Sequence, residues 1–336
     1  MHQTTLRDKY ININPFTDFG FKKLFGSKPN KDLLIDFLNQ VIKEQGRIVD
    51  LTYLKNEHLG RNAKDRNAVF DIYCENEKGE KFIVEMQKAK HNFFKERSIY
   101  YSTFPIQEQA KKGNWDYQLT AVYTVGLLDF VFNDTDENQK NNYYHHKVKL
   151  MEIKKKKVFY DKLTFIYIEL PKFTKTIEEL NTHFEKWLYV LKHMPDLQNI
   201  PSKLQERIFK KVFREAEIAQ LTPKAYQEYE DSLKRYRDLK GVIDTAKEEG
   251  LTEGLMKGKQ LGLTEGKQLG LAEGKQLGLA EGKQLGLAEG KQLGLMKGKQ
   301  EMVINMHKQG MNIDTIAEIS NLSTQKINSI LKKQNT

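Results

Sequence analysis

The chain has 336 residues, which is enough for about two domains and for at least one sizeable hydrophobic core. Its formal charge of +10 favours a polyanionic partner such as nucleic acid, and its 39% hydrophobic residues exclude a wholly disordered chain. A single cysteine, Cys74, excludes an internal disulfide and an all-cysteine zinc site. No segment approaches the ~20 apolar residues of a membrane span, and no signal peptide is recognisable, so we expect a cytoplasmic location and no membrane partner.

The first 132 residues predict a helix, three strands, a second helix and a fourth strand. In chain order we expect an amphipathic helix over 30–45, strands over 48–59, 67–77 and 80–90, a helix over 92–112 and a buried strand over 117–132. Asn30 is expected to cap the first helix and Gly46 to stop it. Gly79 provides a turn between the second and third strands, and Pro105 is expected to break or kink the second helix.

Another buried strand and three helices are expected after the lysine run 154–157. The strand spans 163–170, and the helices span 175–194, 202–219 and 223–248. Thr222 and Pro223 have the residue types that open a helix. The lysine run would attract phosphate groups, although such a run is more often a solvated loop.

From Lys259 onwards the chain repeats an eight-residue unit of the type KQLGLAEG, with glycine at every fourth position from Gly250 to Gly298. Each helical glycine costs about 1 kcal/mol relative to alanine, so a lone helix would be marginal. Two such helices, however, could approach closely along the glycine row. A helical self-association tract that forms homo-oligomers and a flexible spacer therefore both remain open.

The last residues, 301–336, predict three short helices. The second is expected at Ile313 to Ser320, followed by a turn at 321–323 and a third helix from Thr324. Two short helices joined in this way are similar to a helix-turn-helix. A small packing or dimerisation bundle fits the pattern equally well.

Candidate catalytic residues lie on the predicted hairpin at 67–90. A hairpin folded about Lys78 places Asp71 directly opposite Glu85. Strand alternation then puts Asp71, Glu85 and Gln87 on one face. The other face is expected to be a hydrophobic core that contains Phe70, Ile72, Cys74, Phe82, Val84 and Met86.

Two opposed carboxylates among apolar neighbours repel each other, and a bound cation would remove this repulsion. Mg²⁺ and Mn²⁺ prefer such hard oxygen ligands, and either ion can bind phosphate, activate water and stabilise a leaving oxygen. The spacing alone leaves a second interpretation open, in which the hairpin is an ordinary one with Asp71 and Glu85 facing solvent.

Several short segments resemble a known family in their order and spacing. They are FTDFGFKKLFG (16–26), DLLIDFLN (32–39), VFDIY (69–73), IVEMQ (83–87), RSIYYS (97–102) with Gln109 and Gly113 downstream, and IELPKF (168–173). Together they resemble the PD-(D/E)xK nuclease superfamily, and more narrowly its Rpn family of recombination-promoting nucleases, also described as transposases. The resemblance covers about residues 1–250.

The resemblance implies cleavage of double-stranded DNA with Asp71, Glu85 and Gln87 as catalytic residues. Mg²⁺ (or Mn²⁺) would be held by Asp71, Glu85 and the backbone carbonyl of Met86. The superfamily usually has lysine at the third position, where this chain has Gln87. Glutamine can hydrogen-bond a water molecule or a phosphate oxygen, but it supplies no positive charge.

A nearby cation is therefore expected to take over the role of the missing lysine, and the candidates are Lys88, Lys90 and Lys22. Two polar residues of the family-like segments are further candidates for contact with the site or with DNA. They are Asp18, in the N-terminal segment, and Gln109, on the helix after the hairpin.

The resemblance also implies an α+β fold with an α/β nuclease core, in which an αβββαβ unit forms a mixed sheet. We expect a nuclease core at 1–174, a helical subdomain at 175–249, the Gly-rich octapeptide repeat tract at 250–300 and a small helix-turn-helix-like segment at 301–336. The first functional hypothesis is a metal-dependent DNA endonuclease linked to recombination, mobile elements or defence against foreign DNA. The alternative is a weakly active or inactive nuclease-fold protein that binds DNA or a partner.

Overall fold

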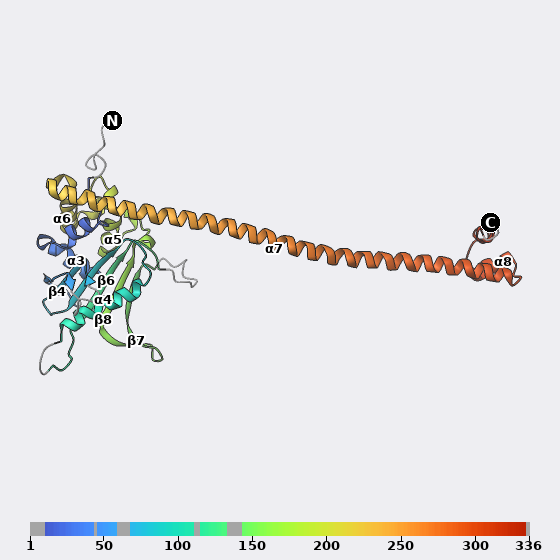
Figure 1. The fold of residues 1–336 in the computed structure, drawn as a ribbon, viewed down its shortest axis with the longest axis horizontal. Helices are drawn as coiled ribbons and strands as arrows, with labels where there is room; N and C mark the ends of the chain where they lie inside the picture. Colours follow the sequence, from blue (N-terminus) through green and yellow to red (C-terminus); the bar gives the residue numbers. More distant parts are fainter. Residues whose placement is uncertain (1–10, 44–45, 59–67, 111–114, 133–142, 334–336) are drawn as a thin grey trace, which may run out of the picture. The chain divides into compact units, whose positions relative to one another are not determined.

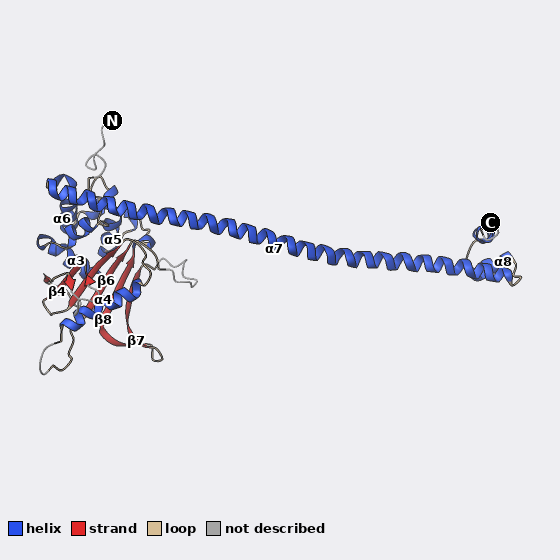
Figure 2. Cartoon of the chain, viewed as in Figure 1, coloured by secondary structure: helices blue, strands red, loops and turns tan. Residues whose placement is uncertain are grey.

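The computed structural model describes residues 11–43, 46–58, 68–110, 115–132 and 143–333 (Figures 1 and 2). Its contacts divide the chain into two compact units, Met1–Lys247 and Glu248–Thr336. Among the described helices, none is long and apolar enough to cross a membrane.

A six-stranded mixed sheet forms the centre of the first unit, with the strand order β1-β4-β5-β6-β8-β7 (Figure 2). Its strands are β1 (Leu51–Tyr53), β4 (Ile72–Asn76), β5 (Lys81–Gln87), β6 (Val122–Leu128), β8 (Lys157–Glu169) and β7 (His145–Glu152). The strands β5, β6 and β8 run parallel, whereas β1, β4 and β7 pair antiparallel with their neighbours. A second small sheet joins β2 (Glu57–His58) to β3 (Ala68–Val69).

Helices cover both faces of the sheet. On one face, the sheet shares its core with α2 (Asp18–Phe25), α3 (Lys31–Val41), α5 (His183–His193), α6 (Arg207–Ala216) and the first turns of α7 (Pro223–Lys308). On the other face lies α4 (Phe94–Glu108), which connects β5 to β6. Central parallel strands covered on both sides are buried throughout, and every residue of β6 is buried.

Trp187 of α5 shows how closely the helices after the sheet belong to its core. The indole ring is fully buried and packs against Phe25, Phe37 and Phe209. Its Nε1 donates a hydrogen bond to Asp36 at 2.7 Å. The sheet therefore shares one hydrophobic core with the helices of residues 183–247.

Most elements predicted up to residue 221 are present, but several are shorter than expected. The helix expected at 30–45 ends at Val41, and the Asn30 side chain donates to the Lys23 carbonyl instead of capping the helix. The segments 48–59 and 67–77 each contain two short strands instead of one. Pro105, where a break or kink is expected, lies inside α4, which runs as one helix from Phe94 to Glu108.

The chain leaves the main sheet at Phe70 and Asp71, which explains why the segment 67–77 is split. Asn56 accepts a hydrogen bond from the Phe70 N–H through its carbonyl and donates one to the Asp71 carbonyl through its side chain, at 3.0 and 2.9 Å. Phe70 packs with Tyr73 and Ile83 on the α4 side. Its predicted place on the opposite face is therefore wrong.

The helix expected at 223–248 extends much further, because α7 continues without interruption to Lys308 and includes the glycine repeats. The side chains of its repeat leucines are exposed, and an added Cβ would meet no atom within 4 Å at any glycine from Gly250 to Gly298. Self-association through this tract stays a prediction.

The second unit ends in the short helices that the sequence predicts, α8 (Ile313–Ser320) and α9 (Thr324–Lys332). Asn312 and Ser323 cap them by accepting hydrogen bonds from backbone N–H groups. Val303, Ile316 and Ile327 form a small buried cluster with Ile330. This cluster explains how such short helices are held.

Candidate functional site

The β4–β5 hairpin has the predicted register. Ile72 pairs with Val84 and Tyr73 with Ile83, so the confirmed pairing places Asp71, one residue before β4, opposite Glu85. The turn depends on Gly79, whose φ of +76° is a conformation that glycine adopts easily. The two carboxylates are therefore brought together by local hairpin geometry.

Two hydrogen bonds fix Asp71 against β5. Its backbone N–H donates to Glu85 Oε1 at 3.2 Å, and its Oδ2 accepts the Met86 N–H at 2.8 Å. The Asp71 side chain thus accepts the hydrogen bond from the Met86 N–H that a backbone carbonyl would accept if β4 began earlier.

The hydrogen-bond pattern of β5 also locates the Met86 carbonyl. Lys81 donates to the Ala121 carbonyl, and Gln87 accepts from the Asp129 N–H, so the odd-numbered residues of β5 bond toward β6. In a parallel pair, alternate residues of a strand direct their N–H and C=O groups to opposite sides, so the even-numbered residues of β5 bond away from β6, toward β4. The Met86 carbonyl therefore lies on the side of Asp71.

Glu85 and Gln87 lie on the α4 side of the sheet, and each is 7% exposed. Gln87 Nε2 donates to Glu85 Oε2 at 3.0 Å. The guanidinium of Arg97, on α4, lies 4.0 Å from the same carboxylate oxygen and packs over the Tyr101 ring. The expectation that these carboxylates could simply face solvent does not hold for Glu85, which is buried.

Burial and the nearby Asp71 carboxylate raise the pKa of Glu85 to about 8. Burial likewise raises the pKa of Asp71, with a further increase from the charge of Asp18. The charges of Lys22 and Lys88 act in the opposite direction. The pair therefore resists double ionisation. A cation between the carboxylate oxygens would favour the doubly ionised form.

Three of the four supporting residues predicted from the sequence lie near this pair. Lys88 forms an ion pair with Asp18, with Nζ and Oδ1 2.5 Å apart. Both residues act electrostatically on Asp71, as does Lys22. The structure therefore brings α2 and the end of β5 to the same site.

Gln109 is not brought to the site. Its Oε1 accepts the Thr120 N–H at 2.7 Å, just before β6 begins at Val122. Val122 pairs with Lys81 at the start of β5, whereas Glu85 and Gln87 lie near its end. The contacts of Gln109 fix the connection between α4 and β6.

Arg97 and Gly126 complete the surroundings of Glu85, and sequence reasoning did not single them out. Gly126 pairs with Glu85 on β6, and a Cβ on it would lie 3.1 Å from the Tyr167 ring. Arg97 lies at helical spacing from Phe94 and Tyr101, both of which pack toward the sheet. The signal that could have identified Arg97 in the sequence was a charged residue on the sheet-facing side of a predicted helix.

The donors available at this site fit a divalent ion of the Mg²⁺ type. Such ions take oxygen ligands and usually keep several waters, so two carboxylates and a carbonyl can suffice. Within the described parts of the chain, no group of three or more His, Cys, Asp or Glu side chains could hold a metal ion. The Met86 carbonyl would therefore be needed beside Asp71 and Glu85.

A mixed sheet flanked by helices, with two apposed carboxylates just before β4 and near the end of β5, fits a nuclease-type fold. Residues 15–246 match the model of the PD-(D/E)XK nuclease family transposases. The chain belongs to this family, which confirms the resemblance stated from the sequence. No curated protein and no solved structure matches the chain. The family match spans all strands of the described sheet and the first turns of α7.

Proposed function

We propose that this protein is a divalent-metal-dependent endonuclease that hydrolyses phosphodiester bonds in double-stranded DNA. The observation that carries the proposal is the fixed pair of carboxylates, the half-buried Asp71 and the buried Glu85, joined through the Asp71 N–H at 3.2 Å. An ionised carboxylate that is buried beside a second one is costly unless a cation offsets the repulsion, and perturbed carboxyl groups of this kind concentrate at functional sites.

The ligands that we infer are one carboxylate oxygen from each of Asp71 and Glu85 and the Met86 carbonyl. Mg²⁺ or Mn²⁺ bound there would supply an electrophile for the phosphate and would lower the pKa of a bound water. The Met86 N–H holds Asp71 Oδ2, which leaves Oδ1 as the oxygen directed to a ligand. The chain's own contribution is thus to orient two carboxylates before the ion binds.

Gln87 differs from the lysine that the superfamily usually has. In the absence of a ligand its amide is held by Glu85, and on release it would hydrogen-bond the attacking water or a phosphate oxygen. Positive charge would come from Lys22 and Lys88, which act on Asp71, and from Arg97 beside Glu85. Three cations, from α2, from the residue after β5 and from α4, would then share the role of one lysine.

A plasmid-nicking assay tests the proposal directly. Supercoiled plasmid is incubated with the protein in EDTA, in Mg²⁺ and in Mn²⁺, beside Asp71→Ala and Glu85→Ala. Asp161→Asn is a matched control, because this carboxylate of β8 is exposed. Nicking should require the ion, disappear in both site variants and persist in the control. Equal cutting by the site variants would refute the assignment.

A weakly active or inactive nuclease-fold protein is the second candidate function, and the Gln87 substitution is the observation that favours it. Such a protein would bind DNA in EDTA as well as in Mg²⁺ and would nick plasmid slowly or not at all. An active enzyme would fit the family's link to transposition, and we infer a role in recombination, mobile elements or defence against foreign DNA. Comparing recombination frequency between cells with the wild-type gene and cells with Asp71→Ala tests this role.

A further inference from the structure

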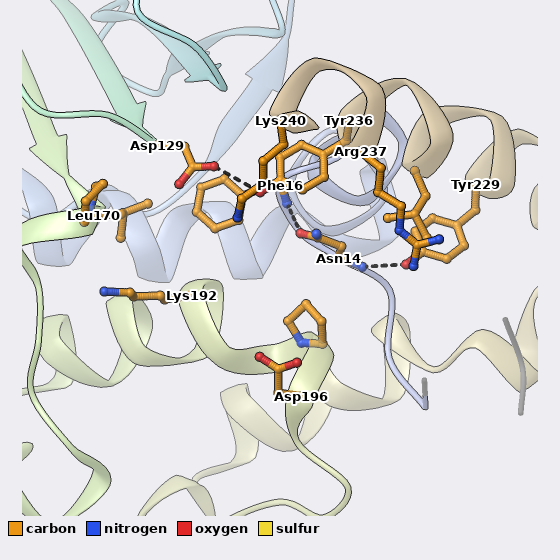
Figure 3. A pocket seen from close by; sticks show the side chains of 13 residues that line it. Asn14, Phe16, Asp129, Leu170, Lys192, Asp196, Tyr229, Tyr236, Arg237 and Lys240 are labelled. Atoms are coloured by element: carbon orange, nitrogen blue, oxygen red, sulfur yellow. Dashed lines mark hydrogen bonds between the residues drawn. The ribbon is translucent and has the colours of Figure 1, made fainter. Parts of the chain in front are cut away.

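A cavity of about 510 Å³ lies between the edge of the sheet, α5, the first turns of α7 and the segment before α2 (Figure 3). Its volume falls in the range of about 300–1,000 Å³ that is typical of ligand pockets. All the residues that line it belong to the first compact unit, between Asn14 and Lys240. The family match assigns no role to this cavity.

Cations line the cavity from two helices. Lys192 comes from α5, and Arg237 and Lys240 come from α7 (Figure 3). Lys192 is half-buried and donates to the Phe173 carbonyl at 2.6 Å, which leaves two of its three N–H donors for other partners. Asp129 and Asp196 are the acidic residues of the lining, so the cations are in excess. An anionic group would be attracted to this wall.

Aromatic rings and a carboxyl group line other parts of the cavity. Phe16 and Tyr236 contribute rings, and the Tyr236 hydroxyl donates to Asp129 Oδ2 at 3.0 Å (Figure 3). No residue that the structure describes donates a hydrogen bond to Asp129 Oδ1. This oxygen can therefore accept from a ligand donor such as an amino or imino group.

One backbone hydrogen bond links the lining of the cavity to the end of β5. The N–H of Asp129, which follows β6, donates to the Gln87 carbonyl at the end of β5, at 2.9 Å. Leu170, which follows β8, also lines the cavity. The cavity and the carboxylate pair therefore share the edge at the carboxyl ends of the parallel strands, where open α/β sheets generally bind ligands.

We propose that this cavity binds one nucleotide, with its phosphate against Lys192, Arg237 and Lys240 and its base between Phe16, Tyr236 and Asp129. Cations hold the phosphate, aromatic rings pack against a base of any sequence, and the carboxyl oxygen accepts a base N–H. The nucleotide is either a unit of the substrate strand or a free nucleotide. The first source rests on the proposed DNA substrate, whereas nucleotide binding itself does not.

Calorimetric titration of the full chain with deoxyadenosine monophosphate in EDTA tests the binding, with inorganic phosphate as a second probe. The test variant is Arg237→Ala/Lys240→Ala. The matched control is Lys234→Ala/Arg235→Ala, which removes two charges from the same helix but from residues that do not line the cavity. Because all four side chains are exposed, both variants should fold, and thermal unfolding checks this.

We expect the test variant to bind the nucleotide at least about tenfold more weakly, since charge-assisted contacts are lost, and the control to bind within about twofold of wild type. Inorganic phosphate should bind more weakly than the nucleotide, because it lacks the base. Equal nucleotide affinity in both variants, or no binding by the wild-type chain, would overturn the proposal.

DNA binding in EDTA over a range of salt concentrations distinguishes the two sources. If the cavity holds a unit of the substrate strand, the test variant should bind duplex DNA more weakly, and its salt dependence should flatten by about one unit of slope for each lost contact. Unchanged DNA binding together with lost nucleotide binding identifies a free nucleotide. Plasmid nicking reports separately on the proposed nuclease, since a chain that never cuts can still bind the nucleotide here.

Discussion

Replacing Glu85 with glutamine should stabilise the metal-free protein and abolish its response to metal ions. Glu85 is buried beside Asp71, and its pKa is raised from 4.5 to about 8. The folded state therefore binds a proton more tightly than the unfolded state. The stabilisation is fully present below about pH 4.5 and is lost as the pH rises toward about 8.

The size of the effect follows from the same shift. At about 1.4 kcal/mol per pKa unit, a rise from 4.5 to about 8 corresponds to a loss on the order of 3–5 kcal/mol between the acidic and alkaline limits. Glu85→Gln removes this pH-dependent loss of stability, because glutamine does not ionise. Its amide oxygen can still accept the Asp71 N–H, and the Gln87 amide can turn over to accept from the new NH₂ group.

Urea unfolding in EDTA at about pH 5, 7 and 8.5, for wild type and Glu85→Gln, measures the difference. Wild type should lose stability relative to the variant across this interval, and Mg²⁺ should restore stability to wild type alone. Parallel pH profiles for the two proteins would refute the reasoning. An equal gain in stability from Mg²⁺ in the two proteins would also refute it.

Three further predictions follow from the structure. Gln87→Lys should cut plasmid faster than wild type in Mg²⁺, because lysine adds positive charge where the amide contacts Glu85, whereas Gln87→Ala should cut more slowly. Plasmid nicking ranks the three proteins, and the opposite order would contradict the role given to this position. Gly126→Ala should lose about 1–3 kcal/mol of unfolding free energy, because its Cβ would lie 3.1 Å from the buried Tyr167 ring. A chain that ends at Glu249 should be monomeric by light scattering while the full chain is oligomeric, because the leucines and open glycine row of α7 need a partner; the same oligomeric state in both would remove the repeats as the assembling element.

The sequence predicted the pairing of the hairpin correctly because its determinants are local. A turn at Gly79 and strict alternation decide which residues of β4 and β5 face each other, and both can be seen in the chain. The buried strand β6 was equally predictable from the sequence, since a central parallel strand is a continuous apolar run.

The features that sequence reasoning missed depend on contacts across the fold. Phe70 changes face because Asn56 binds the backbone on both sides of it, which no periodicity reveals. Gln109 was a candidate because it belongs to the family-like segments after the hairpin, yet α4 carries it to the other end of the sheet. Arg97 was overlooked because its importance comes from packing against β5. The continuity of α7 through the glycines could not be decided from helix propensity alone.

The contact between the Met86 N–H and Asp71 Oδ2 makes one amide a direct reporter of the site. Because an amide proton exchanges with solvent only when its acceptor moves away, the exchange rate at Met86 records how long Asp71 stays in its ligand-ready orientation. The amides of β5 that bond to β6 would report the opening of the sheet instead. Hydrogen exchange along a single strand can thus separate the mobility of the Asp71 carboxylate from the stability of the fold that carries it.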